Sequence, residues 1–447
     1  MTRYWCELAW LGALDGRVVA GVSITVDGDR ITHVVTGTQS VNGDVRLDGL
    51  TLPGMVNGHS HAFHRGLRGR THGGMGTFWS WRDTMYELAE RLDPDSYLAV
   101  ATAAYAEMAL AGFTTVGEFH YLHHGPGGTP YADPNEMSRV LVEAATRAGL
   151  RITLLDTCYL QAGITSDAVL NPTQRRFSDG TAENWTERAD AMRVDSPTAR
   201  LGAAVHSVRS VHPAAMATVA GWAASLDAPV HAHVSEQPAE NEQCIAAWGC
   251  TPTEVLEREG VLGPGFTAIH ATHLTTQDIQ LYASSGSTAC ICPTTERDLA
   301  DGIGPTAGFR AAGIPMTIGT DSHAIVDPFE EIRAIELNQR LATLARGTHQ
   351  PGELLTAATA AGARSLGWDD AGVIAVGALA DLTTISFDSP RLAGTDPDHA
   401  APAAVFAATA ADVRTVIVGG RTIVADGVHR SVDVSRMLRD SIAAVWA

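Results

Sequence analysis

Short apolar runs alternate with polar turn signals at both ends of the chain. In the first fifty residues, runs such as VVAGVSITV and ITHVV are separated by dipeptides of the Asp-Gly and Asn-Gly type, a rhythm typical of antiparallel strands. Residues 373–430 show the same rhythm in VIAVGALADLTTIS and VRTVIVGGRTIVADG. The two ends together predict one small β-sandwich domain that is built from residues 1–51 and 372–447.

Between these ends, over residues 52–371, the pattern changes to an apolar strand followed by an amphipathic helix, repeated along the chain. The candidate strands are TLPGMVNGH (51–59), TTVGEF (114–119), RITLLDTC (151–158), ARLGAAVHS (199–207), PVHAHVSE (229–236), FTAIHATH (266–273), STACICP (287–293) and PMTIGTDS (315–322). Alternating β and α units of this kind predict an α/β protein with a parallel (β/α)8 barrel.

Helix start signals support the division of the middle segment. Thr251-Pro252-Thr253-Glu254 has the form of a capping box with proline in the first turn. An aspartate followed by proline, which also favours a helix start, occurs at Asp93, Asp133 and Asp327.

The longest polar gap between predicted elements covers residues 159–181. We expect it to form either a lid over a site or a disordered surface loop.

The composition narrows the class of protein. The chain has 447 residues, of which 45% are hydrophobic and 18% charged, as in globular proteins. Its net charge of −19 disfavours nucleic acid or an anionic membrane as the main partner and favours a small molecule. All 31 basic residues are arginine. The absence of lysine excludes Schiff-base and pyridoxal-phosphate chemistry, a P-loop, and a binuclear metal centre bridged by a carboxylated lysine.

Cysteine usage and the N-terminal sequence predict the compartment. The six cysteines show no paired CxxC spacing, so we expect buried free thiols rather than a disulfide or metal framework. Glu7 and Asp15 interrupt what would have to be the apolar core of a signal peptide. No uninterrupted apolar stretch reaches the roughly 18 residues of a membrane span. These features predict a cytoplasmic protein.

Polar residues that can bind a metal gather where four of the predicted strands end. The first strand ends in His59-Ser60-His61, and the spacing of two places both imidazoles on one face of an extended segment. The fifth, sixth and eighth strands end in HAHVSE, IHATH and GTDSH. Three imidazoles and one carboxylate suit Zn²⁺ or Fe²⁺ with a position left open for water. The predicted ligands are His59, His61, His233 and Asp321.

Spacing alone leaves two assignments open. His231 shares the face of His233, so either histidine could complete the ligand set. His270 and His273 compete for the task of orienting or polarising water or substrate. Glu236, three residues beyond His233, is expected to point into the mouth of the barrel as an acid and base carboxylate.

The segments PGMVNGHSHAF, HAHVSE, IHATHL and GTDSH resemble the amidohydrolase superfamily. The resemblance covers nearly the full chain and is to the mononuclear aminohydrolase branch, whose members hydrolyse C–N bonds in amidines and aminated heterocycles. It implies a barrel with a split β-domain. The lysine-free composition agrees, because this branch does not use a carboxylated lysine.

Three further strings, TFWSWRDTMYELAERL, AGFTTVGEFHYLHH and VHSVRSV, are similar to the N-formimino-L-glutamate deiminase family of histidine degradation. Its members hydrolyse N-formimino-L-glutamate to N-formyl-L-glutamate and ammonia. The resemblance implies one zinc ion on the four predicted ligands and a homodimer. It also implies that Glu236 carries the proton and that His270, rather than His273, acts with Asp321. The implied substrate contacts are His64, Arg82, Tyr121, His206 and Arg209.

The chemistry of these contacts fits a dicarboxylate, with one departure from the family pattern. The planar guanidinium groups of Arg82 and Arg209 match carboxylate geometry and supply local positive charge in an acidic protein. Members of the family usually carry glutamine where His64 stands. Histidine still donates one hydrogen bond but has a different shape and titrates near neutrality. The departure therefore concerns substrate preference rather than the metal site.

Other functions make different demands on the same residues. An aminohydrolase that acts on a nucleobase-like ring would need aromatic stacking rather than two arginines. A noncatalytic scaffold would be expected to lack ligands, and every ligand position is filled. A solute-binding module gives no reason for Glu236 beside a metal. The additional histidines His120, His123 and His124 are expected to lie behind the site or at the surface, rather than to bind a second metal.

Overall fold

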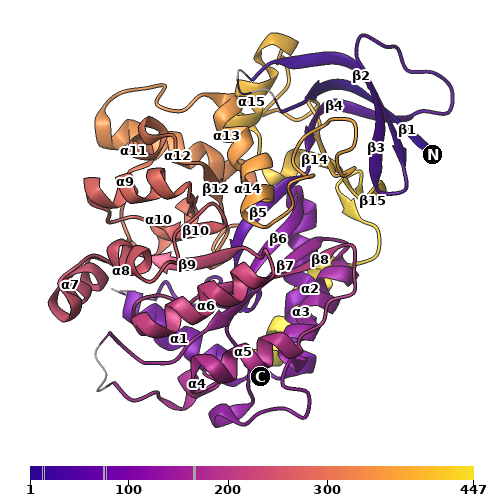
Figure 1. The fold of residues 1–447 in the computed structure, drawn as a ribbon. Helices are drawn as coiled ribbons and strands as arrows, with labels where there is room; N and C mark the ends of the chain where they lie inside the picture. The colour runs from indigo at the N-terminus through magenta and orange to yellow at the C-terminus, as the bar shows by residue number, and fades with distance from the viewer. Residues whose placement is uncertain (13, 15, 74–75, 77, 165–167) are drawn as a thin grey trace.

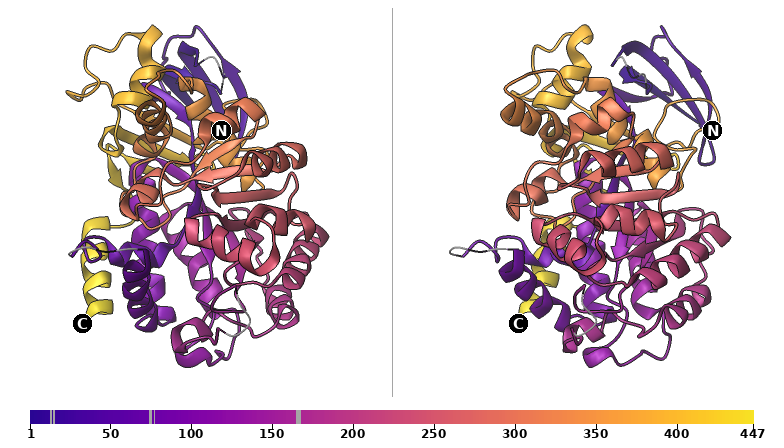
Figure 2. Two further views of the ribbon diagram at one scale, coloured as in Figure 1. Left: turned by 90° about the vertical axis from the view of Figure 1, so that its left-hand side faces the viewer. Right: turned by 60° about the vertical axis from the view of Figure 1, so that its left-hand side comes forward.

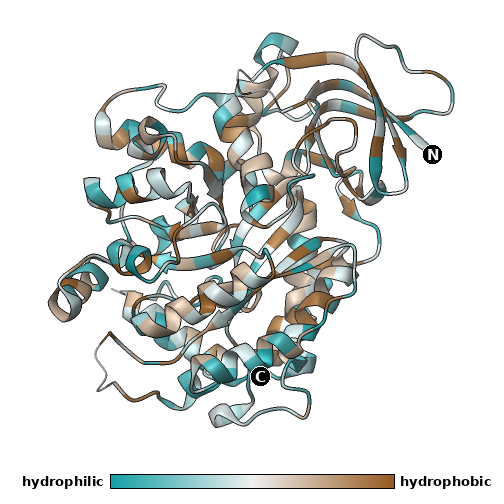
Figure 3. Ribbon diagram, viewed as in Figure 1, coloured by the Kyte–Doolittle hydropathy of each residue, from teal (hydrophilic) through white to brown (hydrophobic). Residues whose placement is uncertain are grey.

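The computed structural model describes residues 1–12, 14, 16–73, 76, 78–164 and 168–447. Figures 1 and 2 show two sheets with helices packed around one of them. In Figure 3, hydrophobic residues follow the strands, whereas peripheral helices such as α9 (Thr276–Ser285) are mostly hydrophilic. Among the helices in the described ranges, none combines the length and apolar character needed to cross a membrane.

Eight parallel strands form the first sheet, in the order in which they occur along the chain. They are β5 (Met55–Ser60), β6 (Phe113–His120), β7 (Arg151–Cys158), β8 (Ala199–Val205), β9 (Val230–Val234), β10 (Phe266–His270), β11 (Thr288–Ile291) and β12 (Met316–Ile318). The circle closes just beyond β12, where Ser60 pairs with Asp321 and the Asp321 amide donates to the His59 carbonyl at 3.0 Å. This arrangement confirms the predicted (β/α)8 barrel.

The second sheet combines strands from both ends of the chain, as predicted. Its order is β16-β15-β14-β13-β4-β1-β2-β3, and only the β1 to β4 pairing is parallel. The strands are β1 (Thr2–Trp10), β2 (Val18–Asp27), β3 (Arg30–Val35), β4 (Val45–Pro53), β13 (Leu382–Ile385), β14 (Val413–Val418), β15 (Arg421–Ala425) and β16 (Val428–His429). Pairing of β13 with β4 joins the two halves. The domain limits at residues 51/52 and 371/372 stay a prediction.

The remaining elements are helices, most of which surround the barrel (Figure 1). They are η1 (Ala62–Leu67), α1 (Phe78–Glu90), α2 (Pro94–Ala111), η2 (Pro126–Gly128), α3 (Glu136–Ala148), α4 (Pro172–Arg175), α5 (Ala182–Ala191), α6 (Pro213–Ser225), α7 (Pro238–Trp248), α8 (Pro252–Arg258), α9, α10 (Pro293–Asp298), α11 (Thr306–Ala312), α12 (Pro328–Thr343), α13 (Pro351–Ala357), α14 (Ala360–Ser365), η3 (Pro397–His399), α15 (Ala400–Ala407), η4 (Ala410–Asp412) and α16 (Val434–Trp446).

Three of the four predicted helix starts coincide with observed caps. Asp93, Thr251 and Asp327 each accept a backbone N–H of the first turn. The prediction at Asp133 was wrong, because α3 begins only at Glu136. The Asp133 carboxylate instead accepts the Asn135 amide at 2.9 Å, and with this side-chain turn the helix begins two residues later than expected.

Buried polar contacts connect the barrel to the mixed sheet and to the C-terminal helix. Arg151 on β7 donates two hydrogen bonds to Asp381, at 2.7 and 3.2 Å, and both side chains are buried. At the other end of the barrel, the Trp446 indole of α16 donates to the Gly66 carbonyl at 3.0 Å. The second contact fixes η1, which follows directly after the histidines of β5.

Two further expectations concern the cysteines and the polar gap. All six cysteines are free, which confirms the predicted thiols; five of them are buried as expected, and Cys250 is partly exposed. Within residues 159–181, positions 165–167 lie outside the described residues. The later part contains α4 and the buried Arg176, which donates to the carbonyls of His124 and Leu92. Movement of this segment as a lid stays a prediction.

Candidate active site

Strands β5, β9 and β12 bring four candidate metal ligands together at the C-terminal end of the barrel. One donor atom each of His59, His61, His233 and Asp321 lies within 4.8 Å of the other three, and all four side chains are buried. Asp321 Oδ1 lies 3.3 Å from His59 Nε2 and 3.4 Å from His61 Nε2, and His59 Nε2 lies 3.2 Å from His233 Nε2. A tetrahedral ion with bonds of about 2.1 Å separates its ligand atoms by about 3.4 Å. The spacing therefore fits one shared ion.

The tautomers and charge states of these histidines also fit a metal. His61 Nδ1 donates to the Phe119 carbonyl at 2.8 Å, and His233 Nδ1 donates to the His206 carbonyl at 2.9 Å. These bonds leave the Nε2 lone pairs directed at the shared space. Burial lowers the pKa of His61 to about 3 and holds those of His59 and His233 well below their usual value. Neutral imidazoles are the form that binds a metal.

Several residues at the strand ends near the site have a left-handed backbone. Ser235 follows β9 with φ +52°, His270 ends β10 with φ +67°, and Asp321 follows β12 with φ +40°. Residues other than glycine adopt this conformation rarely and at a cost of about 1–3 kcal/mol. Three strands thus turn sharply where the candidate catalytic groups stand.

The structure distinguishes the two histidines in each pair that spacing left open. His231 lies on the same strand as His233 but contacts the Ser365 carbonyl through Nε2 at 2.8 Å, away from the ligand group. His273 lies beyond the end of β10, where its Nε2 contacts the Asp301 carbonyl at 2.7 Å. His270, in contrast, lines the pocket beside His233. The structure therefore brings His233 and His270 into the site, and it places His231 and His273 elsewhere.

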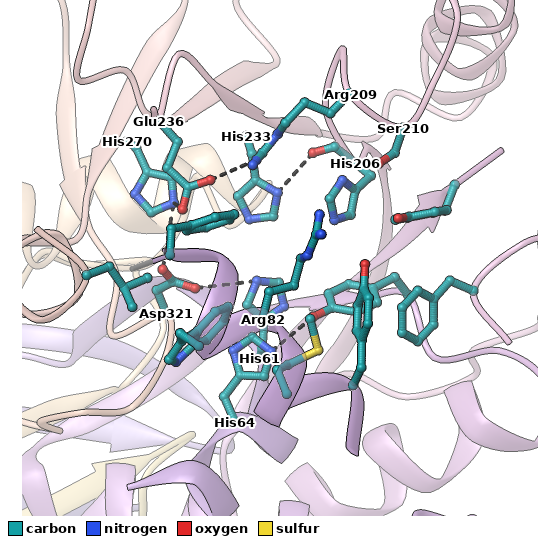
Figure 4. Close-up of a pocket in the computed structure, with 18 of the residues that line it drawn as sticks. His61, His64, Arg82, His206, Arg209, Ser210, His233, Glu236, His270 and Asp321 are labelled. Atoms are coloured by element: carbon teal, nitrogen blue, oxygen red, sulfur yellow. Dashed lines mark hydrogen bonds and ion pairs between the residues drawn. The ribbon is translucent and has the colours of Figure 1, made fainter. Parts of the chain in front are cut away.

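Glu236, His270 and Asp321 form a second cluster beside the ligands (Figure 4). His270 Nε2 lies 3.7 Å from Glu236 Oε1 and 3.7 Å from Asp321 Oδ2. Its Nδ1 lies 3.5 Å from the buried Glu296 carboxylate. Burial alone would lower the pKa of His270, but the carboxylates of Glu236, Asp321 and Glu296 outweigh it and raise this pKa to about 10. His270 thus lies between Glu236 and the candidate ligand Asp321, at the edge of the ligand group.

Arg82 is the cation of the pocket that carries no acidic partner within the described residues. It lies on α1, and its guanidinium stacks over Trp79 at 4.5 Å and Tyr86 at 5.5 Å. Its Nε is buried without a hydrogen-bond partner. Figure 4 shows the side chain reaching into the cavity toward His206. A cation held on aromatic rings in this way is available to a bound anion.

Arg209 lines the same cavity as Arg82 and is held between two carboxylates. Its NH2 donates to Glu236 Oε2 at 2.7 Å, and its Nε forms an ion pair with Glu240 Oε2 at 3.1 Å. These neighbours raise the pKa of Arg209 above its usual value despite burial. The predicted carboxylate contact is therefore paired with the predicted proton carrier in this structure.

The other predicted contacts also line the cavity. The Tyr121 hydroxyl lies 2.9 Å from His64 Nε2, and His64 Nδ1 is buried without a partner. The His206 ring lies 4.7 Å from the Tyr159 ring. Sequence reasoning missed much of the remaining wall, namely Phe78, Trp81, Met85, Tyr86, Tyr159, Ala162, Phe177, Ser210 and Leu299. The aromatic residues of α1 could have been inferred from their helical spacing around Arg82, whereas nothing near Phe177 signals its place.

The three additional histidines lie outside this cavity. Burial lowers the pKa of His120 and His123. The nearby Arg188 lowers it further, and the carboxylates of Asp156 and Asp179 partly oppose the change. His124 Nε2 lies 2.9 Å from Asp179. None of the three belongs to a group of potential metal ligands within the described part of the chain; the one other group there, His270, Cys292 and Asp321, shares Asp321 with the first. Because all three are buried, the surface location that we considered for them is excluded.

Comparison with known proteins agrees with this architecture. The chain is 37% identical over 420 residues to formimidoylglutamate deiminase from Pseudomonas aeruginosa, covering 91% of this chain and 92% of that protein. It is 29% identical over 457 residues to 8-oxoguanine deaminase from the same organism, covering 100% and 99%.

Solved structures give the same fold. An amidohydrolase from Brucella melitensis matches with a TM-score of 0.92 at 34% identity, covering 100% of both chains. The atrazine chlorohydrolase TrzN from Arthrobacter aurescens, complexed with zinc, matches with a TM-score of 0.88 at 23% identity, again over 100% of both chains. The model of the amidohydrolase family matches residues 50–423. This chain therefore belongs to the amidohydrolase family.

Proposed function

We propose that this protein hydrolyses N-formimino-L-glutamate to N-formyl-L-glutamate and ammonia. The observation that carries the proposal is Arg82, a cation without an acidic partner among the described residues. It lines the same cavity as three of the candidate metal ligands, in an acidic protein. A linear amidine with two carboxylates needs such a cation, because each carboxylate loses hydration in the pocket. The relative at 37% identity supports the same substrate.

A divalent ion, zinc or alternatively iron, fits the three imidazoles and one carboxylate, and when bound it acidifies water and polarises the amidine. Arg82 and Arg209 bind the substrate carboxylates, and Tyr121, His206 and His64 contact the remaining polar groups. Asp321 and His270 assist the removal of a proton from the attacking water: the Asp321 carboxylate accepts a hydrogen bond from it, and His270 beside this carboxylate orients or polarises the water or the substrate. Glu236 takes this proton from the water and delivers it to the imino nitrogen. It then transfers the hydroxyl proton of the addition product to the departing amine, so that ammonia leaves and Glu236 is again a carboxylate.

A specific observation favours a second candidate, the deamination of a nucleobase-like ring. Aromatic side chains form a large part of the cavity wall, among them Trp81, Tyr86 and Phe177, and flat rings stack on such surfaces. A relative that covers the whole chain is named 8-oxoguanine deaminase. Under this candidate no carboxylate reaches Arg82.

Ammonia release distinguishes the two candidates. Purified protein loaded with zinc is given N-formimino-L-glutamate and, in parallel, guanine, 8-oxoguanine, cytosine and adenosine. Release from the first compound alone supports the proposal. Release from a heterocycle, with none from N-formimino-L-glutamate, contradicts it.

The expected cytoplasmic location and homodimeric state belong to the same proposal. Sedimentation measures the oligomeric state.

Substitution of Arg82 tests the carboxylate contact. Arg82→Met keeps an unbranched apolar stem but removes the guanidinium and its charge, and a hydrogen bond to a charged group contributes about 1.5–3 kcal/mol. We expect kcat/KM for N-formimino-L-glutamate to fall roughly 10-fold to 150-fold, mainly through KM. The control is Arg91→Met, just beyond α1, where the arginine is paired with Glu87 at the surface. Equal kinetics in both variants would exclude Arg82 as the carboxylate contact.

A further inference from the structure

Glu240 is a buried carboxylate that the proposed reaction does not use. It lies in the first turn of α7, and its side chain has no exposed area. Oε1 accepts the Ser235 amide at 2.9 Å. Oε2 lies 3.1 Å from Arg209 Nε in an ion pair that lacks hydrogen-bond geometry. A buried carboxylate costs free energy unless its oxygens are paired. One side chain thus joins a strained turn to a cation of the cavity.

The first partner, Arg209, is fixed along one edge by this contact. Its Nε faces Glu240 and its NH2 donates to Glu236, while no partner of NH1 occurs within the described ranges. The side chain lines the cavity and lies 5.4 Å above the Phe78 ring. Because Glu240 pairs with Nε and Glu236 with NH2, NH1 is left for a ligand that enters the cavity.

The second partner, Ser235, determines where Glu236 points. Ser235 adopts a left-handed backbone with φ +52° between β9 and α7. The amide that Glu240 accepts belongs to this residue, which directly precedes Glu236. A strained turn persists only where its surroundings hold it, and the buried carboxylate supplies one such contact.

We propose that Glu240 is the positioning residue of this site, because its two oxygens hold the carboxylate-binding arginine and the proton-carrying glutamate in one arrangement. The part that concerns Arg209 rests on the proposed function, since it requires a substrate carboxylate. The part that concerns Ser235 and Glu236 holds for any C–N hydrolysis at this centre.

Glu240→Gln separates the two contacts. The amide oxygen can still accept the Ser235 N–H, but the amide NH2 then faces the Nε–H of Arg209, so two donors oppose each other. We expect KM for N-formimino-L-glutamate to rise at least about tenfold, with a smaller fall in kcat. The matched control is Glu242→Gln on the exposed face of the same helix, which should leave both constants unchanged. A merely structural role would lower Tm and the active fraction and leave KM unchanged.

A KM for Glu240→Gln within about twofold of the Glu242→Gln value would overturn the arginine contact. If Glu240→Gln does not fold, Glu240→Asp provides the test, because the shorter carboxylate cannot reach both partners; unchanged KM and kcat there would equally overturn the proposal. Failure of the proposed function is recognised separately, in the wild-type protein, by silence toward N-formimino-L-glutamate. Glu240→Ala must then lower kcat on the heterocycle that is hydrolysed, and an unchanged kcat would refute the positioning of Glu236.

Discussion

Glu236→Gln is expected to lower kcat by about 10²- to 10⁴-fold, the usual contribution of a positioned acid and base. The carboxamide keeps the shape of the side chain and an oxygen that can accept the Arg209 NH2, but it cannot carry a proton between water and the leaving amine. Metal content should not change, because Glu236 is not among the four ligands. Steady-state ammonia release and metal analysis of the same preparation measure both quantities.

Glu242→Gln serves again as the control for this substitution, because it makes the same chemical change at an exposed position on α7. Its kinetics should match those of the wild type. Turnover by Glu236→Gln within about tenfold of the wild-type rate would remove Glu236 from the proton path. A loss of metal in that variant would instead show that the carboxylate contributes to the metal site.

His233→Ala is expected to weaken metal binding by more than about 100-fold, since even the groups that only orient a ligand contribute 10- to 100-fold. His231→Ala is the matched control, because both histidines lie on β9 and both are buried. The His231 ring contacts the Ser365 carbonyl rather than the ligand group. Its removal should lower Tm but leave one ion per chain.

Metal content after dialysis against a weak chelator, together with the Tm gained on adding Zn²⁺, measures the outcome. His233→Ala should lose both the ion and the gain in Tm, because an ion that binds only the folded state stabilises it. If His231→Ala loses the ion and His233→Ala keeps it, the assignment of the ligand from β9 must be exchanged.

The sequence predicted most of this fold because its signals are local. Apolar strands followed by amphipathic helices indicated the barrel, and alternation at both ends indicated the second sheet. The signal failed at Asp133, where a local side-chain turn uses the aspartate that would otherwise cap the helix. Such competition between a turn and a cap involves the same residue types, so the residue pattern does not distinguish them.

The same contrast between local signals and contacts that the residue pattern does not show applies to the site. The polar residues at the strand ends were visible in the sequence, because parallel strands in a barrel bring their C-terminal ends to one face. The depth of a residue along a strand was not visible, and His231 and His233 therefore looked equivalent. Phe177 and Glu240 also gave no signal, because their places depend on contacts with elements distant in sequence or around the turn that follows β9.

By itself, then, the sequence determined the α/β architecture, the exclusion of lysine chemistry and the set of strand-end residues from which a metal site could be built. Only the tertiary structure decided that His233 and His270 face the cavity and that Arg209 is paired with Glu236 and Glu240 while Arg82 has no acidic partner in the described part of the chain. The physical reason is that periodicity reports which face of an element is buried. The partner that a buried charge finds depends on how separate elements pack.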